Sequence, residues 1–225
     1  MSFDSISMET CVTQNLSTPR EFWTWAQEQE SGPLKVVPPN LRFIIDDVNQ
    51  DWSFPPESFD FIHARCLGGG IDDWSVFMRR CFDLLKPGGR IEITECRPKG
   101  RSDDGSYPED SYLRKWEKNE FARTTQIQGR VWDIAPELPG LLEGAAFKDI
   151  NVAEYPCPIG TWPKDPKLKE IGRYFRAQMV QSAVEGYSLA LFTRFGGWKP
   201  IEVQVLLAHL RGELKTNKMH VYTKA

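Results

Sequence analysis

The sequence predicts an α/β fold in which a parallel sheet is followed by a helical C-terminal part. Short apolar runs at 41–45, 59–63 and 90–95 each end in acidic or charged residues. A helical pattern separates the second run from the third, which is the order of a βαβ unit. The last third of the chain then shows mainly helical spacing of its apolar residues. We therefore expect an N-terminal arm and helix over 1–32 and one α/β domain over 33–225.

The βαβ unit carries the clearest signals. Phe59–His63 and Arg90–Glu95 have the composition of buried strands, and either Asp72 or Asp73 can cap the helix between them. The helix should end at the Lys-Pro-Gly-Gly sequence of residues 86–89, because proline cannot continue the hydrogen-bond ladder and glycine accepts the left-handed conformation. The apolar residues of the helix follow helical spacing: Trp74, Phe77, Met78, Cys81, Leu84 and Leu85. In such units the crossover is right-handed, and ligands collect at the carboxyl ends of the strands.

The remaining elements follow from composition and capping signals. Residues 1–16 are polar and without periodicity, which is typical of a flexible arm. Thr18-Pro19-Arg20-Glu21 favours the start of a helix that runs to about Glu30, with Phe22, Trp23 and Trp25 on it. We expect further helices over Tyr112–Phe121, Pro136–Gly144, Pro166–Met179, Gly186–Phe195 and Pro200–Leu214, and strands over Lys148–Tyr155 and His220–Lys224.

Composition excludes several classes of protein. The formal charge is −3, from 28 basic and 31 acidic residues, which argues against a nucleic-acid partner. The five cysteines lie far apart in the sequence and form no CxxC pair, so we expect no metal site. With neither a secretory signal nor an apolar run near the length of a membrane span, we expect a cytoplasmic protein with reduced thiols and no membrane partner. Cys81 should belong to the core.

Several motifs together resemble one protein family. They are VPPNLRF with IDD behind it, SFDFIHAR, LLKPGG, SDDGSYPEDS, GTWPKDPKLKEIGRY and EVQVLLAHLRGEL, which span roughly residues 33–215. This order is similar to the fungal LaeA-like branch of the class I S-adenosylmethionine (SAM) methyltransferases. The resemblance implies a Rossmann-like sheet with a helical C-terminal cover, and a place in fungal secondary metabolism or its regulation.

One departure from the family affects the expected chemistry. In the family, a first strand, a Gly-rich turn, a helix and a second strand should precede Val37. Residues 1–36 contain a single glycine, Gly32. Asp46 and Asp47 match the family's adenine-side acids and would form one edge of a cofactor pocket. Each buried hydrogen bond left unmade costs roughly 1–3 kcal/mol, so the loss of several weakens cofactor binding by orders of magnitude. We therefore expect a truncated sheet that lacks the first strand-helix-strand unit and uses no cofactor, with SAM binding as the alternative.

Three polar residues at the predicted ligand edge are candidate catalytic groups. His63 and Arg65 follow one strand, and Glu95 closes the next; they could polarise a carbonyl or move a proton. The structural alternatives are a histidine bonded to the following loop and a glutamate that caps or pairs with Arg97. Gly68-Gly69-Gly70 lacks the Lys-Ser/Thr of a phosphate-binding loop, so it is better interpreted as a tight turn.

Aromatic residues after the third strand are candidates for contact with substrate. In the family these parts cover the substrate pocket, and aromatic rings there suit a large, flat, apolar ligand. The alternative for each is an ordinary core position. The candidates are Tyr107, Trp116, Trp132, Trp162 and Tyr187. His209, inside an amphipathic helix, and His220, in the tail, carry little functional signal.

We predict an enzyme that has kept the family's substrate half and lost its cofactor half. It would bind a hydrophobic polyketide- or terpenoid-type intermediate and promote cyclisation (including cycloaddition), isomerisation or dehydration. The alternatives are a SAM-dependent methyltransferase whose cofactor site is completed by dimerisation, and a non-catalytic scaffold or regulatory partner. Because open sheet edges attract partners, we also expect a homodimer that forms through the N-terminal helix and the exposed edge.

Overall fold

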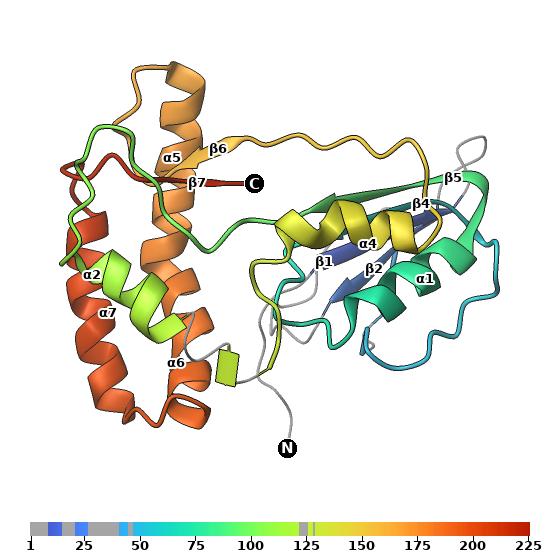
Figure 1. The fold of residues 1–225 in the computed structure, drawn as a ribbon, viewed down its shortest axis with the longest axis horizontal. Coiled ribbons are helices and arrows are strands. Elements are labelled where there is room, and N and C mark those ends of the chain that lie inside the picture. Colours follow the sequence, from blue (N-terminus) through green and yellow to red (C-terminus); the bar gives the residue numbers. More distant parts are fainter. Residues whose placement is uncertain (1–8, 15–20, 27–40, 45–46, 122–125, 128) are drawn as a thin grey trace. The chain divides into compact units, whose positions relative to one another are not determined.

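The computed structural model describes residues 9–14, 21–26, 41–44, 47–121, 126–127 and 129–225 (Figure 1). The chain divides into two compact units. Unit 1 comprises residues 1–95 and 134–152, and unit 2 comprises residues 96–133 and 153–225.

Unit 1 contains a five-stranded sheet with the order β3-β2-β1-β4-β5. The strands are β1 (Glu9–Gln14), β2 (Glu21–Ala26), β3 (Leu41–Ile44), β4 (Phe59–Arg65) and β5 (Leu85–Thr94). β1 is antiparallel to both β2 and β4, whereas β2 is parallel to β3 and β4 is parallel to β5. The carboxyl ends of β2 to β5 therefore share one edge, and β1 runs in the opposite direction.

The prediction for the N-terminal segment is wrong at its described residues. Glu21–Ala26 forms a strand rather than a helix, and Glu9–Gln14 forms a strand rather than a flexible arm. The aromatic and β-branched residues of Phe22–Trp25 favour a strand, and pairing within a sheet overrides a local capping signal. The capping residues 18–20 lie outside the described part of the chain. The hairpin of β1 and β2 thus takes the place between β3 and β4, while the expected dimer stays a prediction.

The predicted βαβ unit is confirmed. Helix α1 (Trp74–Leu84) joins β4 to β5, and β5 begins directly at Leu85, before the Pro-Gly-Gly sequence that was expected to precede it. Helix α4 (Leu138–Gly144), which follows the short 3₁₀ turn η2 (Ala135–Glu137), packs against α1 (Figure 1). Cys81 is fully buried in this core, and burial raises the pKa of its thiol.

Asp73, rather than Asp72, caps α1. Its side chain accepts a hydrogen bond from the Val76 backbone N–H at 3.0 Å. We expect Asp73→Ala to lower the free energy of unfolding by about 1 kcal/mol, because an N-cap acceptor satisfies an orphan helix N–H. Urea denaturation followed by circular dichroism measures the change. Asp83→Ala, which removes the same charge at an exposed position in the last turn of α1, is the control and should change stability by less than about 0.5 kcal/mol; equal losses for both would contradict the assignment.

Unit 2 is mainly helical, as predicted. It contains α2 (Tyr112–Arg114) with the π-helix η1 (Lys115–Phe121), then α5 (Pro166–Gln178), the π-helix η3 (Met179–Ala183), α6 (Val184–Arg194) and α7 (Pro200–Leu214). Helix α5 begins as expected, since the Asp165 side chain caps the Leu168 N–H at 2.8 Å. The helices enclose a second core whose largest fully buried side chains include Phe192, Leu207 and Leu210.

The predicted strand Lys148–Tyr155 is absent from the described structure. Asp149 has φ +55°, and the Val152 side chain is 69% exposed, so the alternating pattern has no sheet to bury it. The strand begins later, as β6 (Pro156–Pro158), which pairs antiparallel with the predicted C-terminal strand β7 (Tyr222–Lys224).

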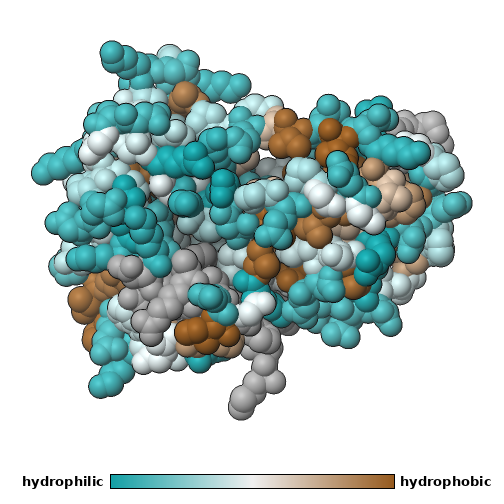
Figure 2. All heavy atoms as spheres, in the orientation of Figure 1, coloured by the Kyte–Doolittle hydropathy of each residue, from teal (hydrophilic) through white to brown (hydrophobic). Residues whose placement is uncertain are grey.

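Figure 2 shows that the visible face is mainly hydrophilic, with apolar residues in small separate patches. Within the described ranges, the helices are too short or too polar to cross a membrane.

Candidate functional site

Glu95 is buried at the carboxyl edge of the sheet in unit 1. Its side chain follows β5, and only 6% of the residue is exposed. Oε1 accepts a hydrogen bond from the Leu67 N–H at 2.6 Å, and Oε2 accepts one from the Gly68 N–H at 3.3 Å. Burial raises the pKa of Glu95 to about 7, although these hydrogen bonds act in the opposite direction. Glu95 therefore anchors the turn after β4 and can change its protonation state near neutral pH.

His63 and Arg65 lie on β4 but form no shared site with Glu95. His63 lies two residues before the end of the strand and pairs with Glu92 of β5, with 3.0 Å between Nδ1 and Oε2. Arg65 is the last residue of β4 and is exposed. Within the described residues, no hydrogen bond or ion pair joins any two of the three candidate catalytic residues. The alternative partner expected for Glu95 is engaged elsewhere, because Arg97 forms a 2.7 Å ion pair with Asp133 in unit 2.

The loops after β3 and β4 are tied together beside this edge. Asp47 is exposed and accepts the Asn49 N–H at 3.0 Å. The Asn49 side chain then donates to the Gly70 carbonyl at 2.9 Å and accepts from the Asp72 N–H at 2.8 Å. The Gly70 N–H bonds to the Leu67 carbonyl at 2.9 Å, which confirms that the triple glycine forms a tight turn. Asp46, the other predicted cofactor residue, lies outside the described residues.

The described residues do not fit SAM. A Gly-rich turn that approaches the methionine moiety should follow the carboxyl end of a central parallel strand. Here the central strand β1 is antiparallel, so its carboxyl end at Gln14 lies at the opposite edge of the sheet. The first glycine of the chain is Gly32. Among the described residues, the carboxyl edge therefore offers Asp47 as a possible contact but not the turn that this cofactor needs.

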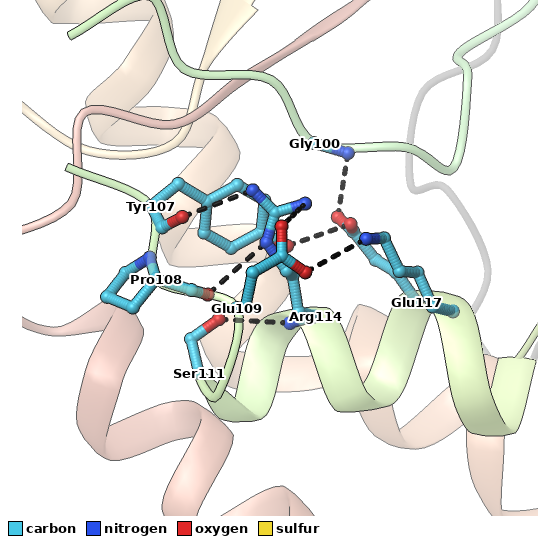
Figure 3. Close-up of polar contacts among 8 residues, drawn as sticks. Gly100, Tyr107, Pro108, Glu109, Ser111, Arg114 and Glu117 are labelled. Atoms are coloured by element: carbon cyan, nitrogen blue, oxygen red, sulfur yellow. Dashed lines mark hydrogen bonds and ion pairs between the residues drawn. The ribbon is translucent and has the colours of Figure 1, made fainter. Parts of the chain in front are cut away.

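Tyr107 is part of a buried polar cluster rather than a substrate surface (Figure 3). Its hydroxyl donates to Oε2 of Glu117 at 2.8 Å, and the Gly100 N–H donates to Oε1 of the same carboxylate at 2.9 Å. The Arg114 guanidinium lies 4.0 Å from the centre of the Tyr107 ring. Burial raises the pKa of Glu117 to about 7. The cluster fastens the loop after Cys96 to the helix formed by α2 and η1.

Three other predicted substrate residues lie in the core of unit 2. Trp116 is buried, and its indole N–H donates to Oγ of Ser188 at 2.7 Å. Trp132 and Tyr187 are partly buried, and their rings meet edge to face with centroids 6.0 Å apart. Core packing therefore accounts for Tyr107, Trp116, Trp132 and Tyr187.

Trp162 lies in an open cleft of unit 2 with a volume of about 420 Å³, which we call the β7 cleft. Aromatic or aliphatic walls come from Tyr155, Trp162, Leu168 and Tyr222, with two prolines of β6. The polar lining residues are Asp103, Glu154 and Lys224. The lining residues come from β6, β7, α5 and the loops beside them. β6 contacts both α5 and β7, although β7 is distant from them in the sequence (Figure 1). It thus combines ring faces with a few charged groups, as small-molecule sites do.

His220 contacts Trp162, one of the residues that line this cleft, although its place in the tail carried little functional signal in the sequence. Its imidazole stacks on Trp162 with ring centroids 5.1 Å apart, and Nδ1 lies 2.5 Å from Oδ2 of Asp104. Hydrogen bonds from Ser106, His220 and Ser102 hold the pKa of Asp104 below its ordinary value. Tyr222 and Lys224, which line the cleft, were also missed. Strand alternation in 220–224 was the signal available, but its partner strand could not be inferred from sequence.

The described residues contain no cluster of three or more metal-ligating side chains. The expectation that the chain holds no metal stays a prediction.

Comparisons with known proteins give the chain its family. A methyltransferase-domain model matches residues 7–152. Methyltransferase pytC of Aspergillus terreus is 38% identical over 184 residues, which cover 82% of this chain and 56% of pytC. The secondary metabolism regulator LAE1 of Cochliobolus heterostrophus is 34% identical over 189 residues, which cover 83% and 61% of the two chains. The probable methyltransferase tdiE of Emericella nidulans is 27% identical over 195 residues, which cover 86% and 60%.

The chain thus spans 56% to 61% of the length of these three relatives. Among solved structures, a Haemonchus contortus N-methyltransferase covers 82% of this chain at 16% identity and a TM-score of 0.40, which is too low to support an argument. The family model, by contrast, matches more than half of the chain. The chain therefore belongs to the methyltransferase-domain family, in the LaeA-like branch of the class I methyltransferases.

Proposed function

We propose that this chain is an enzyme of fungal secondary metabolism that binds a hydrophobic small molecule in the β7 cleft. The names of its relatives, which include a methyltransferase and a secondary metabolism regulator, support this setting. The observation that carries the proposal is the cleft itself, whose volume of about 420 Å³ and aromatic walls are typical of small-molecule sites. Ring faces such as those of Trp162 and Tyr222 suit a flat, apolar polyketide- or terpenoid-type intermediate.

The proposed reaction is a cyclisation, including cycloaddition, an isomerisation or a dehydration that proceeds without SAM. Such reactions rearrange one molecule or release water, so they need no group donor. An apolar cleft can hold a flexible intermediate in a reactive conformation, and orientation alone can lower a barrier by several kcal/mol. The antiparallel direction of β1 supports the SAM-independent form.

Glu95, His63 and Arg65 of unit 1 stay the candidate catalytic residues. They form a separate part of the proposal, because none of them lines the β7 cleft of unit 2. Glu95 has the best-suited environment, because its pKa of about 7 lets it act as an acid or a base at neutral pH. His63 Nδ1 lies 3.0 Å from Oε2 of Glu92, and Arg65 is exposed at the strand end. If the folded variants Glu95→Gln, His63→Ala and Arg65→Ala all keep full activity, this assignment of catalytic residues is wrong.

A second candidate is SAM-dependent methyl transfer to the same class of small molecule. The match to the methyltransferase-domain model and the 38% identity to pytC favour it. It would need a second chain to complete the cofactor site, and therefore a homodimer. A monomer by light scattering across micromolar concentrations would remove this candidate in its dimeric form.

The experiment that tests the proposal uses the natural intermediate. Deletion of the gene should cause one apolar metabolite to accumulate, and purified protein should convert that metabolite in the absence of SAM. Leu168→Glu, which places a charge on an apolar wall of the cleft, should slow the conversion at least tenfold. Conversion that requires added SAM and increases the product mass by one methyl group would instead establish the second candidate. No conversion under either condition would contradict both.

A further inference from the structure

The β7 cleft contains two hydrogen-bonding side chains on one face of the same strand. Tyr222 and Lys224 are two residues apart on β7 and both line the cleft. Side chains alternate along a strand, so these two share a face while Thr223 between them is turned away and buried. The Tyr222 and Lys224 Cα atoms are therefore about 6.6 Å apart, two strand residues. The strand presents a phenol and an ammonium group to the same ligand space.

An acid from another segment holds each of the two groups. The Tyr222 hydroxyl donates to Oδ1 of Asp103 at 3.0 Å, and Lys224 forms an ion pair with Oε2 of Glu154. An ammonium group carries three N–H donors, and Glu154 accepts one of them. Two N–H donors of Lys224 thus have no acceptor among the described residues, and the Tyr222 oxygen can still accept a hydrogen bond.

The ion pair leaves Lys224 available to a ligand. The Lys224 side chain is 28% exposed and that of Glu154 is 53% exposed, so solvent screens their attraction. Exposed ion pairs of this kind contribute little net free energy, so a ligand anion can compete with Glu154 for the Lys224 ammonium group. The cleft is also lined by the carboxylates of Asp103 and Glu154, which Tyr222 and Lys224 hold. Arg101, whose backbone pairs with that of Tyr222, adds a positive charge that lowers the pKa of Glu154 and offsets part of this negative charge.

We propose that the β7 cleft selects flat apolar ligands that carry an anionic oxygen, such as a carboxylate, phenolate or enolate, and that Lys224 binds this oxygen. The ring faces and Leu168 would hold the apolar body of the ligand. The inference rests on the proposed function, and it narrows the substrate class from any hydrophobic intermediate to an acidic or enolisable one.

Two fluorescent probes of similar aromatic character but different charge test the inference. N-phenyl-1-naphthylamine is neutral, and 8-anilinonaphthalene-1-sulfonate is anionic. We expect both to bind the whole chain, and the anionic probe to compete with the neutral one. Lys224→Met should weaken binding of the anionic probe at least tenfold, since it removes a hydrogen bond between two charged groups. The same variant should change the affinity for the neutral probe less than twofold.

Lys218→Met is the matched control, because Lys218 does not line the cleft and the substitution removes the same charge. It should leave both affinities unchanged, and thermal unfolding of all variants should match that of the unsubstituted chain. Loss of both probes in a folded Lys224→Met variant, or of neither, would overturn the selection of anions. By contrast, failure of Leu168→Glu to weaken the neutral probe would contradict the cleft site on which the proposed function depends.

Discussion

Gly172→Ala is expected to destabilise unit 2 by about 3 kcal/mol, at the upper end of the cost of overpacking a core. Gly172 is buried on α5, where the helix touches the backbone of Gly160. A Cβ at position 172 would lie 2.0 Å from the Gly160 carbonyl oxygen and 3.1 Å from its carbonyl carbon. Because both contacts are backbone, neither can rotate away. Separation of the segments would also strain the hydrogen bond from the Gly160 N–H to the Gly172 carbonyl at 3.1 Å.

The same substitution should also weaken ligands of the β7 cleft, because Gly160 lies between Pro158 and Trp162, two of its lining residues. Gly186→Ala, at the third residue of α6, which continues directly from η3, is the control. A Cβ there meets nothing within 4 Å, so alanine should stabilise the helix by about 0.5–1 kcal/mol. Urea denaturation followed by circular dichroism measures both variants. A Gly172→Ala protein as stable as the unsubstituted chain would show that α5 and Gly160 do not pack this closely.

The second large effect is a loss of stability as the pH rises from about 5 to about 8. Burial raises the pKa of both Glu95 and Glu117 from 4.5 to about 7. Between pH 4.5 and pH 7 each of these carboxyl groups is protonated in the folded chain but ionised in the unfolded chain. The free energy of unfolding therefore falls as the pH rises through this range, and each group's contribution is fully present only below pH 4.5. This contribution is lost as the pH rises through 7. A shift of this size corresponds to roughly 3 kcal/mol for each group.

Glutamine keeps the shape and neutrality of a protonated glutamate but cannot ionise. Glu117→Gln and Glu95→Gln should therefore each reduce the fall in unfolding free energy between pH 5 and pH 8, by denaturant titration at several pH values. Glu109→Gln is the control, because the Glu109 side chain is 78% exposed, and it should leave the pH dependence unchanged. If both buried variants keep the full slope, other groups must carry it, and the assigned environments of these carboxyl groups are wrong.

Helices and strands could be predicted from the sequence where a local pattern agreed with tertiary packing. The helical spacing from Trp74 to Leu84 and the caps Asp73 and Asp165 all appear in the structure as helix faces and caps. The predictions were wrong where pairing between distant segments determines the secondary structure. Phe22–Trp25 forms a strand because it pairs with β1 and β3, and Lys148–Tyr155 has strand alternation without a sheet to accept it.

The candidate site, like the fold, could be predicted where local sequence patterns determine it and not where distant segments come together. Strand ends could be located in the sequence, so Glu95 was expected at the carboxyl edge of the sheet. Its two backbone partners could not be predicted, because they depend on how the turn after β4 folds. Trp162 was a candidate because it is aromatic and because the resemblance to the family implies that its segment covers the substrate pocket. Tyr222 and Lys224 reach the cleft only through pairing of β7 with β6, which lies 64 or more residues earlier in the chain.

The central claim is that the chain acts without SAM, and calorimetric titration of the purified protein with SAM and S-adenosylhomocysteine tests it most directly. We expect no binding heat at millimolar ligand, because β1 is antiparallel and the described sheet edge lacks the Gly-rich turn. Binding of either compound at micromolar strength would contradict this account. It would show that the cofactor site is completed in another way, and that methyl transfer is the chemistry to pursue.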